Sequence, residues 1–288
     1  MHYILDIRTL SLTSGIISLI LSICMLYVYI RRKTYSGFTQ WAISSILNCF
    51  AMVFLSLRGF VPDFITIIFA NTLIILAIGF IAYGMEIFLG STRRAWLFIS
   101  LTMILFVSFL YFTYYSPNVN ARIIIISAIL ATLYAYCGYI VHRFVPRLMN
   151  DHNVLLTGVF SILSIWFVFR IISTVFIEGP IVDFMRASAI QGVSIMVFFG
   201  GNIFVTIGLI IFNFQRVEID LQATQDEVKT LRGIIPICSS CKKIRDDEGI
   251  WNQIETYIRS HSEAEFTHGI CPDCRDKLYP ELPKRNKE

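Results

Sequence analysis

Four of the seven cysteines form two C-x2-C pairs near the C-terminal end of the sequence. Cys238 and Cys241 make up the first pair, and Cys271 and Cys274 make up the second. Two such pairs can present four thiolates to one metal ion in a tetrahedral arrangement. A reducing cytoplasm does not sustain disulfides, so this spacing predicts a metal site there rather than two cross-links.

Zinc is the ion that a closed site of four thiolates favours, and iron in a rubredoxin-like site is the alternative. The surrounding segment is too short to be secure on apolar burial alone, so a metal would supply folding free energy. The turn residues 246–249 predict a short hairpin after the first pair, and Trp251, Ile254 and Ile258 recur at helical spacing. We therefore expect a small zinc-ribbon-like domain over residues 233–288.

Polar side chains within long apolar segments form a second candidate set. Arg170 is the clearest, because an ionisable residue inside a membrane is costly and is by default a functional hypothesis. Asn71, Asn48 and Gln191 are expected at comparable depths in three other segments. These side chains could line a pocket in which Arg170 attracts an anionic or carbonyl-bearing ligand. The alternative is that Arg170 reaches the interface or bonds neighbouring helices as a structural residue.

Composition identifies the elements that must position these residues. The hydrophobic share is 56% and the charged share 15%, against about a quarter charged in a soluble domain. Seven apolar runs are each close to the roughly 20 residues that a membrane-spanning helix needs. They cover about 9–30, 39–57, 63–90, 96–115, 122–142, 154–177 and 187–213. The sequence predicts an α-helical membrane protein with seven transmembrane helices over residues 1–213.

Basic residues between the runs predict the orientation, because short cytoplasmic loops carry an excess of lysine and arginine. With the N-terminus outside, seven basic residues are inside: Arg31, Arg32, Lys33, Arg93, Arg94, Arg143 and Arg147. Four are then outside: Arg8, Arg58, Arg122 and Arg186. This count favours N-out and C-in, which places residues 214–288 in the cytoplasm. Glu86, near the inner end of the third run, is expected to contact Arg93, Arg94 or Arg143.

Residues 214–232 form a connector of different composition. Val217, Leu221, Thr224, Val228 and Leu231 are spaced alternately four and three apart, which is the pattern of a coiled-coil seam. The seam predicts a helix that could pair with a second copy of the chain. An amphipathic helix that packs on its own tail domain fits the spacing nearly as well.

Charge and motifs exclude several classes of function. Residues 1–213 carry 12 basic and 6 acidic side chains, whereas residues 214–288 carry 12 and 14. A tail with net charge −2 does not favour nucleic-acid binding. No kinase, phosphate-binding, hydrolase or deaminase motif is present, so we do not expect an enzyme. The sequence contains no detectable internal repeat and no matched pair of broken helices, so it does not favour a transporter.

Two segments resemble known bacterial families. Residues 231–258 and 266–274, which include all four paired cysteines, resemble a module at the C-termini of bacterial signalling proteins, where it follows sensory or receiver domains. Residues 5–10 and 32–41 resemble the multi-helix membrane sensor region of bacterial diguanylate cyclases and histidine kinases. The sequence has no cyclase or kinase domain, so the resemblance does not imply nucleotide synthesis or phosphorylation.

Together these features predict a receptor in the bacterial inner membrane. A small ligand or a membrane signal would act on the seven helices, and the seventh would pass the change to a zinc module that binds a cytoplasmic signalling protein. The alternative is a membrane-anchored redox- or metal-responsive protein in which the four thiolates are the sensing site.

Overall fold

The computed structural model describes residues 7–149, 154–181, 184–186, 189–232, 235–246, 248–262 and 264–281. The chain divides into two compact units, Met1–Leu221 and Gln222–Glu288. Each unit is described by itself below.

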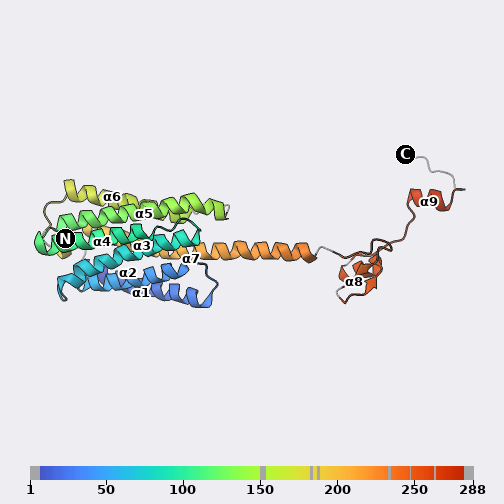
Figure 1. Ribbon diagram of the computed structural model, residues 1–288, viewed down its shortest axis with the longest axis horizontal. Coiled ribbons are helices and arrows are strands. Elements are labelled where there is room, and N and C mark those ends of the chain that lie inside the picture. The colour runs from blue at the N-terminus through green and yellow to red at the C-terminus, as the bar shows by residue number, and fades with distance from the viewer. Residues whose placement is uncertain are drawn as a thin grey trace, which may run out of the picture. The chain divides into compact units, whose positions relative to one another are not determined.

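Seven helices of the described residues are long and apolar enough to cross a membrane, which indicates a multi-pass membrane protein (Figure 1). They are α1 (Ile7–Arg31), α2 (Phe38–Ser56), α3 (Ala70–Phe88), α4 (Ala95–Leu110), α5 (Val119–Met149), α6 (Val154–Phe176) and α7 (Ala189–Arg232). Two π-helical turns, η1 (Phe64–Phe69) and η2 (Tyr111–Tyr115), extend α3 and α4, and a 3-10 turn, η3 (Phe184–Arg186), precedes α7. The predicted number and positions of the membrane helices are confirmed by length and composition, while the N-out orientation stays a prediction.

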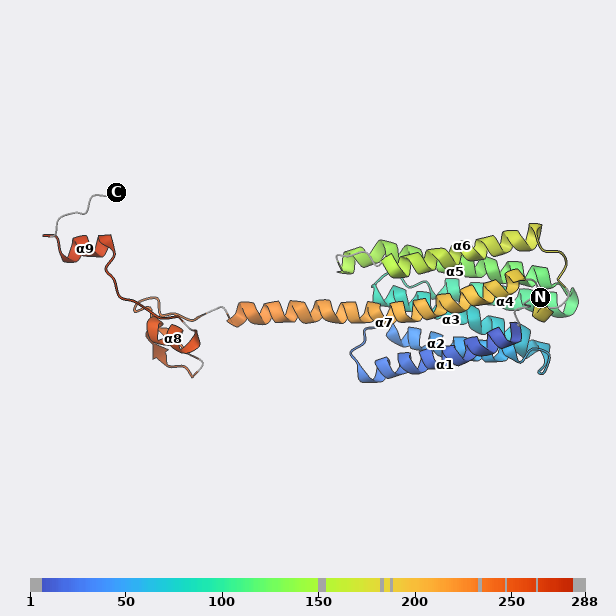
Figure 2. The ribbon, with the colours of Figure 1, turned by 180° about the vertical axis from the view of Figure 1, so that it is seen from behind.

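The helices form a bundle in which α3 is the most enclosed. Close backbone approaches join α1 to α2, α2 to α3 and α5 to α6, and α3 also packs on α4 and α5. Figure 2 shows α7 running between the α1–α2 pair and the α5–α6 pair. No other element in the described part of the chain approaches the α7 backbone as closely as α5 approaches α6. Side chains rather than close backbone packing therefore hold α7.

The bundle has two ends, which we name by one residue each. The Gln191 end contains the first turns of α1, α5 and α7, the last turns of α2 and α6, and both π-helical turns. The Tyr35 end contains the connections 32–37 and 89–94 and the middle of α7 around Asn213. Single π-helical turns are frequent at functional sites, which directs attention to the Gln191 end.

A tightly packed aromatic cluster closes the Tyr35 end. Trp41 is 1% exposed, and its indole N–H donates to the Ile81 carbonyl at 3.2 Å. Its ring lies 5.0 Å from the Phe88 ring, which in turn lies 4.8 Å from that of Phe212 in α7. Gly84 makes room for the indole, because a Cβ there would lie 2.6 Å from Trp41. The absence of a side chain at this position therefore permits the cluster to form.

The connector differs from the sequence-based expectation in one respect. The seventh membrane helix does not end near residue 213 but continues without interruption to Arg232, so the connector is part of α7. Val217 is half-buried, and Leu221 is 56% exposed. The structure does not describe the side chains of Val228 and Leu231. Pairing between two copies of the chain therefore stays a prediction.

The tail unit contains a hairpin of β1 (Ile244–Arg245) and β2 (Trp251–Asn252), followed by α8 (Ile254–His261) and α9 (Pro272–Leu278). The hairpin and the helix after it confirm the local prediction except at Trp251, which lies in β2 and not on the helix with Ile254 and Ile258. Among the apolar side chains described in this unit, Ile244 alone is buried. The described residues therefore bury little apolar surface, and the zinc-ribbon-like domain stays a prediction.

Replacing Gly84 with alanine should disrupt the Trp41 cluster. The added Cβ would also lie 2.8 Å from the Gly37 carbonyl oxygen, so we expect a loss of about 1–3 kcal/mol in stability from overpacking. Thermal unfolding in detergent, followed by circular dichroism, measures this as a lower midpoint. Gly158→Ala is the matched control, because no described atom outside its own stretch of helix lies within 4 Å of its Cβ position. Equal midpoints for the two variants would contradict the packing argument.

Candidate functional site

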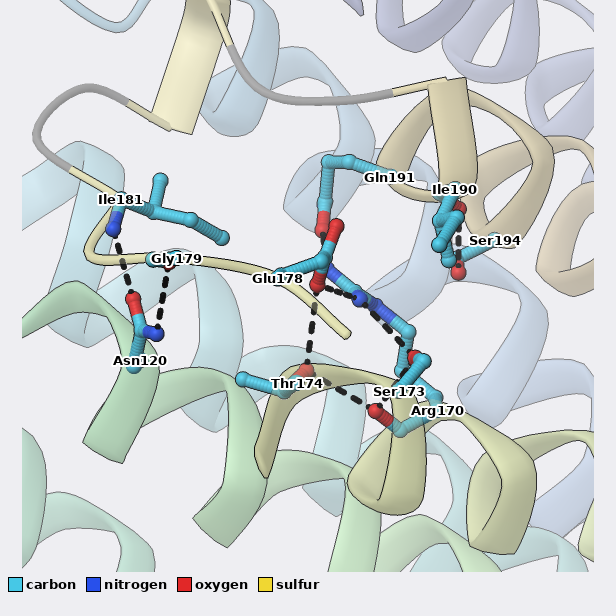
Figure 3. A network of polar contacts seen from close by, with 10 residues as sticks. All are labelled: Asn120, Arg170, Ser173, Thr174, Glu178, Gly179, Ile181, Ile190, Gln191 and Ser194. Atoms are coloured by element: carbon cyan, nitrogen blue, oxygen red, sulfur yellow. Dashed lines mark hydrogen bonds and ion pairs between the residues drawn. The ribbon is translucent and has the colours of Figure 1, made fainter. Parts of the chain in front are cut away.

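Arg170 is the centre of a buried polar network at the Gln191 end (Figure 3). The residue lies in α6 and is 1% exposed, so its side chain lies inside the bundle and not on its outer surface. Its guanidinium forms an ion pair with Glu178 and donates to the Gln191 side-chain oxygen at 2.6 Å. A third donor reaches the Ser173 hydroxyl at 3.4 Å. Groups from two helices and a connecting segment thus surround one cation.

Glu178 is the functional residue that the sequence reasoning missed. It follows the last residue of α6 by two positions, and its backbone N–H still donates to the Ser173 carbonyl at 2.9 Å. This continued turn returns the carboxylate over Arg170, where it also accepts from the Thr174 hydroxyl at 3.3 Å. The signal in the sequence was the spacing of 3, 4 and 8 residues after Arg170, which places these side chains on one helical face.

The segment after Glu178 is fixed to α5. Asn120 donates to the Gly179 carbonyl at 3.2 Å and accepts from the Ile181 backbone N–H at 2.9 Å. Figure 3 shows this amide holding the extended strip of chain beside the ion pair. Asn120 therefore positions the segment that carries Glu178.

A cavity of about 90 Å³ adjoins the network. Its wall is mostly apolar, with contributions from α2, α3, α5, α6, α7 and η3. The polar residues of the wall are Asn71, Ser127, Arg170, Gln191 and Ser194. An apolar cavity with a few polar groups is the usual form of a small-molecule site.

The structure brings together three of the four membrane residues predicted to bind a ligand. Arg170, Asn71 and Gln191 line the same cavity. Asn48 lies apart from it, since its amide donates to the Ser18 hydroxyl at 3.0 Å and its side chain lines a different, smaller cavity. Because Glu178 matches the charge of Arg170, this arginine acts as a structural bond between α6, α7 and their connection. A ligand in the cavity would meet its hydrogen-bonding edge rather than an uncompensated charge.

Glu86 satisfies its buried carboxylate in a related way at the Tyr35 end. It is fully buried, and it accepts from the Arg94 backbone N–H at 2.8 Å and from the Tyr136 hydroxyl at 2.5 Å. The expected contact with Arg94 is therefore made by the backbone of that residue.

Asn213 ties α7 to the connection between α1 and α2. Its side-chain oxygen accepts from the Tyr35 backbone N–H at 3.2 Å, and its amide donates to the Lys33 carbonyl at 3.1 Å. One side chain of α7 thus bonds two residues of a short loop. Movement of α7 along its axis would break both bonds.

Arg216, one turn further along α7, bonds to the C-terminal end of α3. Its guanidinium donates to the Phe88 carbonyl at 2.5 Å and lies 4.3 Å from the centre of the Tyr35 ring. The Tyr35 hydroxyl donates to Asp220. Burial, together with this hydrogen bond, raises the pKa of Tyr35, so the hydroxyl stays protonated at neutral pH.

The four paired cysteines lie in the tail as two separate C-x2-C turns, which we call the two dithiol clips: Cys238 with Cys241, and Cys271 with Cys274. In the first, the Cys238 N–H donates to the Lys243 carbonyl at 2.8 Å, and Lys242 adopts a left-handed φ of 60°, which turns the chain back. In the second, Cys271 precedes α9 and Cys274 lies in its first turn. Backbone groups of Cys241 lower the pKa of the Cys238 thiol, and those of Cys274 lower the pKa of the Cys271 thiol.

Four thiols are a donor set that suits zinc or iron, and each clip already holds two of them together. The structure does not gather three or more potential ligands at one point anywhere in the ranges that it describes. The metal site therefore stays a prediction based on the donor chemistry of the two clips.

Comparisons with protein-family models, with curated proteins and with solved structures find no match for this chain. The resemblance of the tail and of the membrane segment to bacterial signalling families accordingly stays an expectation from the sequence.

The ion pair of Arg170 and Glu178 can be tested by a double-mutant cycle. Arg170→Met and Glu178→Gln should each destabilise the protein by about 3–5 kcal/mol, because each removes one partner from a buried pair. The double variant should lose less than the sum of the two, and the difference in unfolding free energy measures their interaction. Strictly additive losses would show that the two side chains do not interact.

Proposed function

We propose that the protein is a signal receptor of the bacterial inner membrane with its C-terminal tail in the cytoplasm. A small ligand in the cavity beside Arg170 shifts α7, and α7 passes the shift to the tail. The observation that supports this proposal is that one uninterrupted helix carries Gln191 in its first turn, Asn213 and Arg216 in its middle, and the tail at its end.

The length of α7 makes it a mechanical link. The part of α7 within the first unit, residues 189–221, spans about 50 Å at a rise of 1.5 Å per residue. A rigid helix transmits translation or rotation along its whole length. The weak backbone packing of α7 favours such movement, since side-chain contacts can exchange between two arrangements without separating closely packed helices.

A ligand shifts such an equilibrium only by binding the two arrangements with different affinity. Gln191 lines the cavity and bonds Arg170, so a ligand that competes for its amide changes a contact made by α7 itself. The same movement would alter the bonds of Asn213 and Arg216 at the Tyr35 end. These two sets of contacts are the elements that would differ between the arrangements.

The tail is the proposed output. Cys238, Cys241, Cys271 and Cys274 would hold zinc, which supplies folding free energy to a unit with little apolar burial. Several apolar side chains of the tail are exposed and offer a surface to a cytoplasmic signalling protein. They are Ile235, Ile237, Ile250, Trp251, Ile270 and Leu278.

A second candidate function is redox or metal sensing by the tail itself. The thiols of Cys241, Cys271 and Cys274 are exposed, and Cys238 is partly exposed. Solvent access allows oxidation or exchange of metal, which a closed structural site would resist.

Perturbation at one end of α7 should be measurable at the other. We expect Gln191→Ala to raise amide hydrogen exchange in residues 31–37 several-fold, because α7 shifts when its bond to Arg170 is lost. Mass spectrometry on protein in lipid nanodiscs measures this. Thr206→Val is the control, since Thr206 bonds Asn202 within α7 at 3.3 Å. Unchanged exchange in the Gln191 variant would contradict transmission through α7.

Metal content separates the two candidate functions. We expect one colourless zinc ion per full-length chain, and its loss in the double variant Cys238→Ser, Cys271→Ser. Elemental analysis and an absorption spectrum measure this, and tail proteolysis reports the accompanying loss of folding. Iron with a visible spectrum, or reactive thiols without metal, would instead favour sensing by the tail.

A further inference from the structure

We propose that the ligand is a small amphiphilic anion, such as an aliphatic carboxylate, whose charged group is bound by Arg122 and whose chain enters the cavity beside Arg170. This inference rests on the proposed function, because it names the ligand class of the same receptor site. It moves recognition of the charge from Arg170 to a different arginine.

Arg122 is a buried cation with unused hydrogen-bonding capacity. It lies in the first turns of α5 and is 9% exposed. One guanidinium nitrogen donates to the Thr113 hydroxyl at 3.3 Å, whereas the buried Nε–H has no partner among the described residues. A buried donor of this kind normally has a partner, and arginine offers five donors in a fork that matches a carboxylate. Arg122 is therefore suited to an anion that enters from outside the chain.

A small cavity of about 30 Å³ lies against Arg122, and Arg58 and Asn71 also line it. The Asp63 carboxylate lies near enough to act on Arg122, but no carboxylate contributes to the cavity wall in the described part of the chain. Arg58 is oriented in part by Phe184, whose ring centre lies 4.8 Å from the guanidinium carbon. Two arginines and one amide thus line this space and present hydrogen-bond donors to an anion.

This small cavity adjoins the larger one. Asn71, Ile123, Ile126 and Phe184 line both. Beyond these shared side chains the larger cavity is walled mostly by apolar residues of α2, α5, α6 and α7. A molecule with one anionic end and a short aliphatic chain fits this succession of charged and apolar walls.

The ion pair explains why Arg170 does not take the anion. Glu178 already matches its charge, and an added carboxylate would stand near a second carboxylate. The chain of the ligand would instead pass Gln191, the residue that joins the cavity to α7. When Arg122 binds the anionic group, the apolar chain of the ligand lies beside Gln191 and can therefore affect α7.

Radiolabelled octanoate is the probe for this site, with the full-length protein in phosphatidylcholine nanodiscs. We expect saturable binding that octanoate and decanoate displace and that octanol and octylamine do not. Arg122→Gln should weaken binding at least tenfold, and Arg122→Lys, which keeps the charge, should retain most of it. Arg143→Gln is the matched control, because Arg143 is exposed in the same helix at the Tyr35 end.

Nanodiscs that contain phosphatidylglycerol distinguish two sources of the anion. Weaker octanoate binding there would assign the site to an anionic lipid, and unchanged binding would assign it to a free acid. Equal affinity in the wild type and Arg122→Gln, with both folded by circular dichroism, would overturn the proposal. The hydrogen-exchange experiment on Gln191→Ala uses no ligand. It therefore tests transmission through α7 independently of whether octanoate binds.

Discussion

A hydrocarbon interior offers no hydrogen-bonding partner, and the placement of most buried polar side chains in the described part of this bundle follows from that constraint. Asn48 donates a hydrogen bond to Ser18, and Glu86 accepts hydrogen bonds from Tyr136 and from the backbone of Arg94. Each of these groups is satisfied by a neighbouring helix or connection, as a dry environment requires. Most polar contacts between distant segments therefore tie the bundle together at its two ends, while the middle is joined mainly by apolar packing.

The same constraint makes α7 sensitive to its end contacts. A hydrogen bond to a charged group contributes about 1.5–3 kcal/mol, and coupling between two ligand sites is typically about 1–3 kcal/mol. The single bond between Arg170 and Gln191 is therefore large enough to bias two arrangements of α7 by a factor of ten or more. Asn213 and Arg216 hold the opposite end with bonds of similar kind, so neither set of contacts alone fixes the helix.

Sequence patterns predicted what depends on composition and periodicity. The seven spans follow from apolar length, and the proximity of Arg170 to Gln191 follows from their similar depth. The spacing after Arg170 was the one signal for Glu178, and it was not sufficient, because the direction of a residue beyond the end of a helix depends on the turn that carries it. Arg122 was counted among loop residues, and its burial depends on how α5 packs against η2. Depth is readable from sequence, whereas partners across helices require the packed structure.

The tail obeys a different constraint, because its described side chains bury almost no apolar surface. A unit in which Ile244 is the buried apolar residue gains little from the hydrophobic effect, at about 25 cal/mol per Å² of area removed from water. Ordering its backbone costs about 1–2 kcal/mol per residue. The hairpin and two short helices cannot offset that cost, so another source of free energy must stabilise them. Two dithiol clips and an exposed apolar surface are the groups through which a metal ion and a partner protein would provide it.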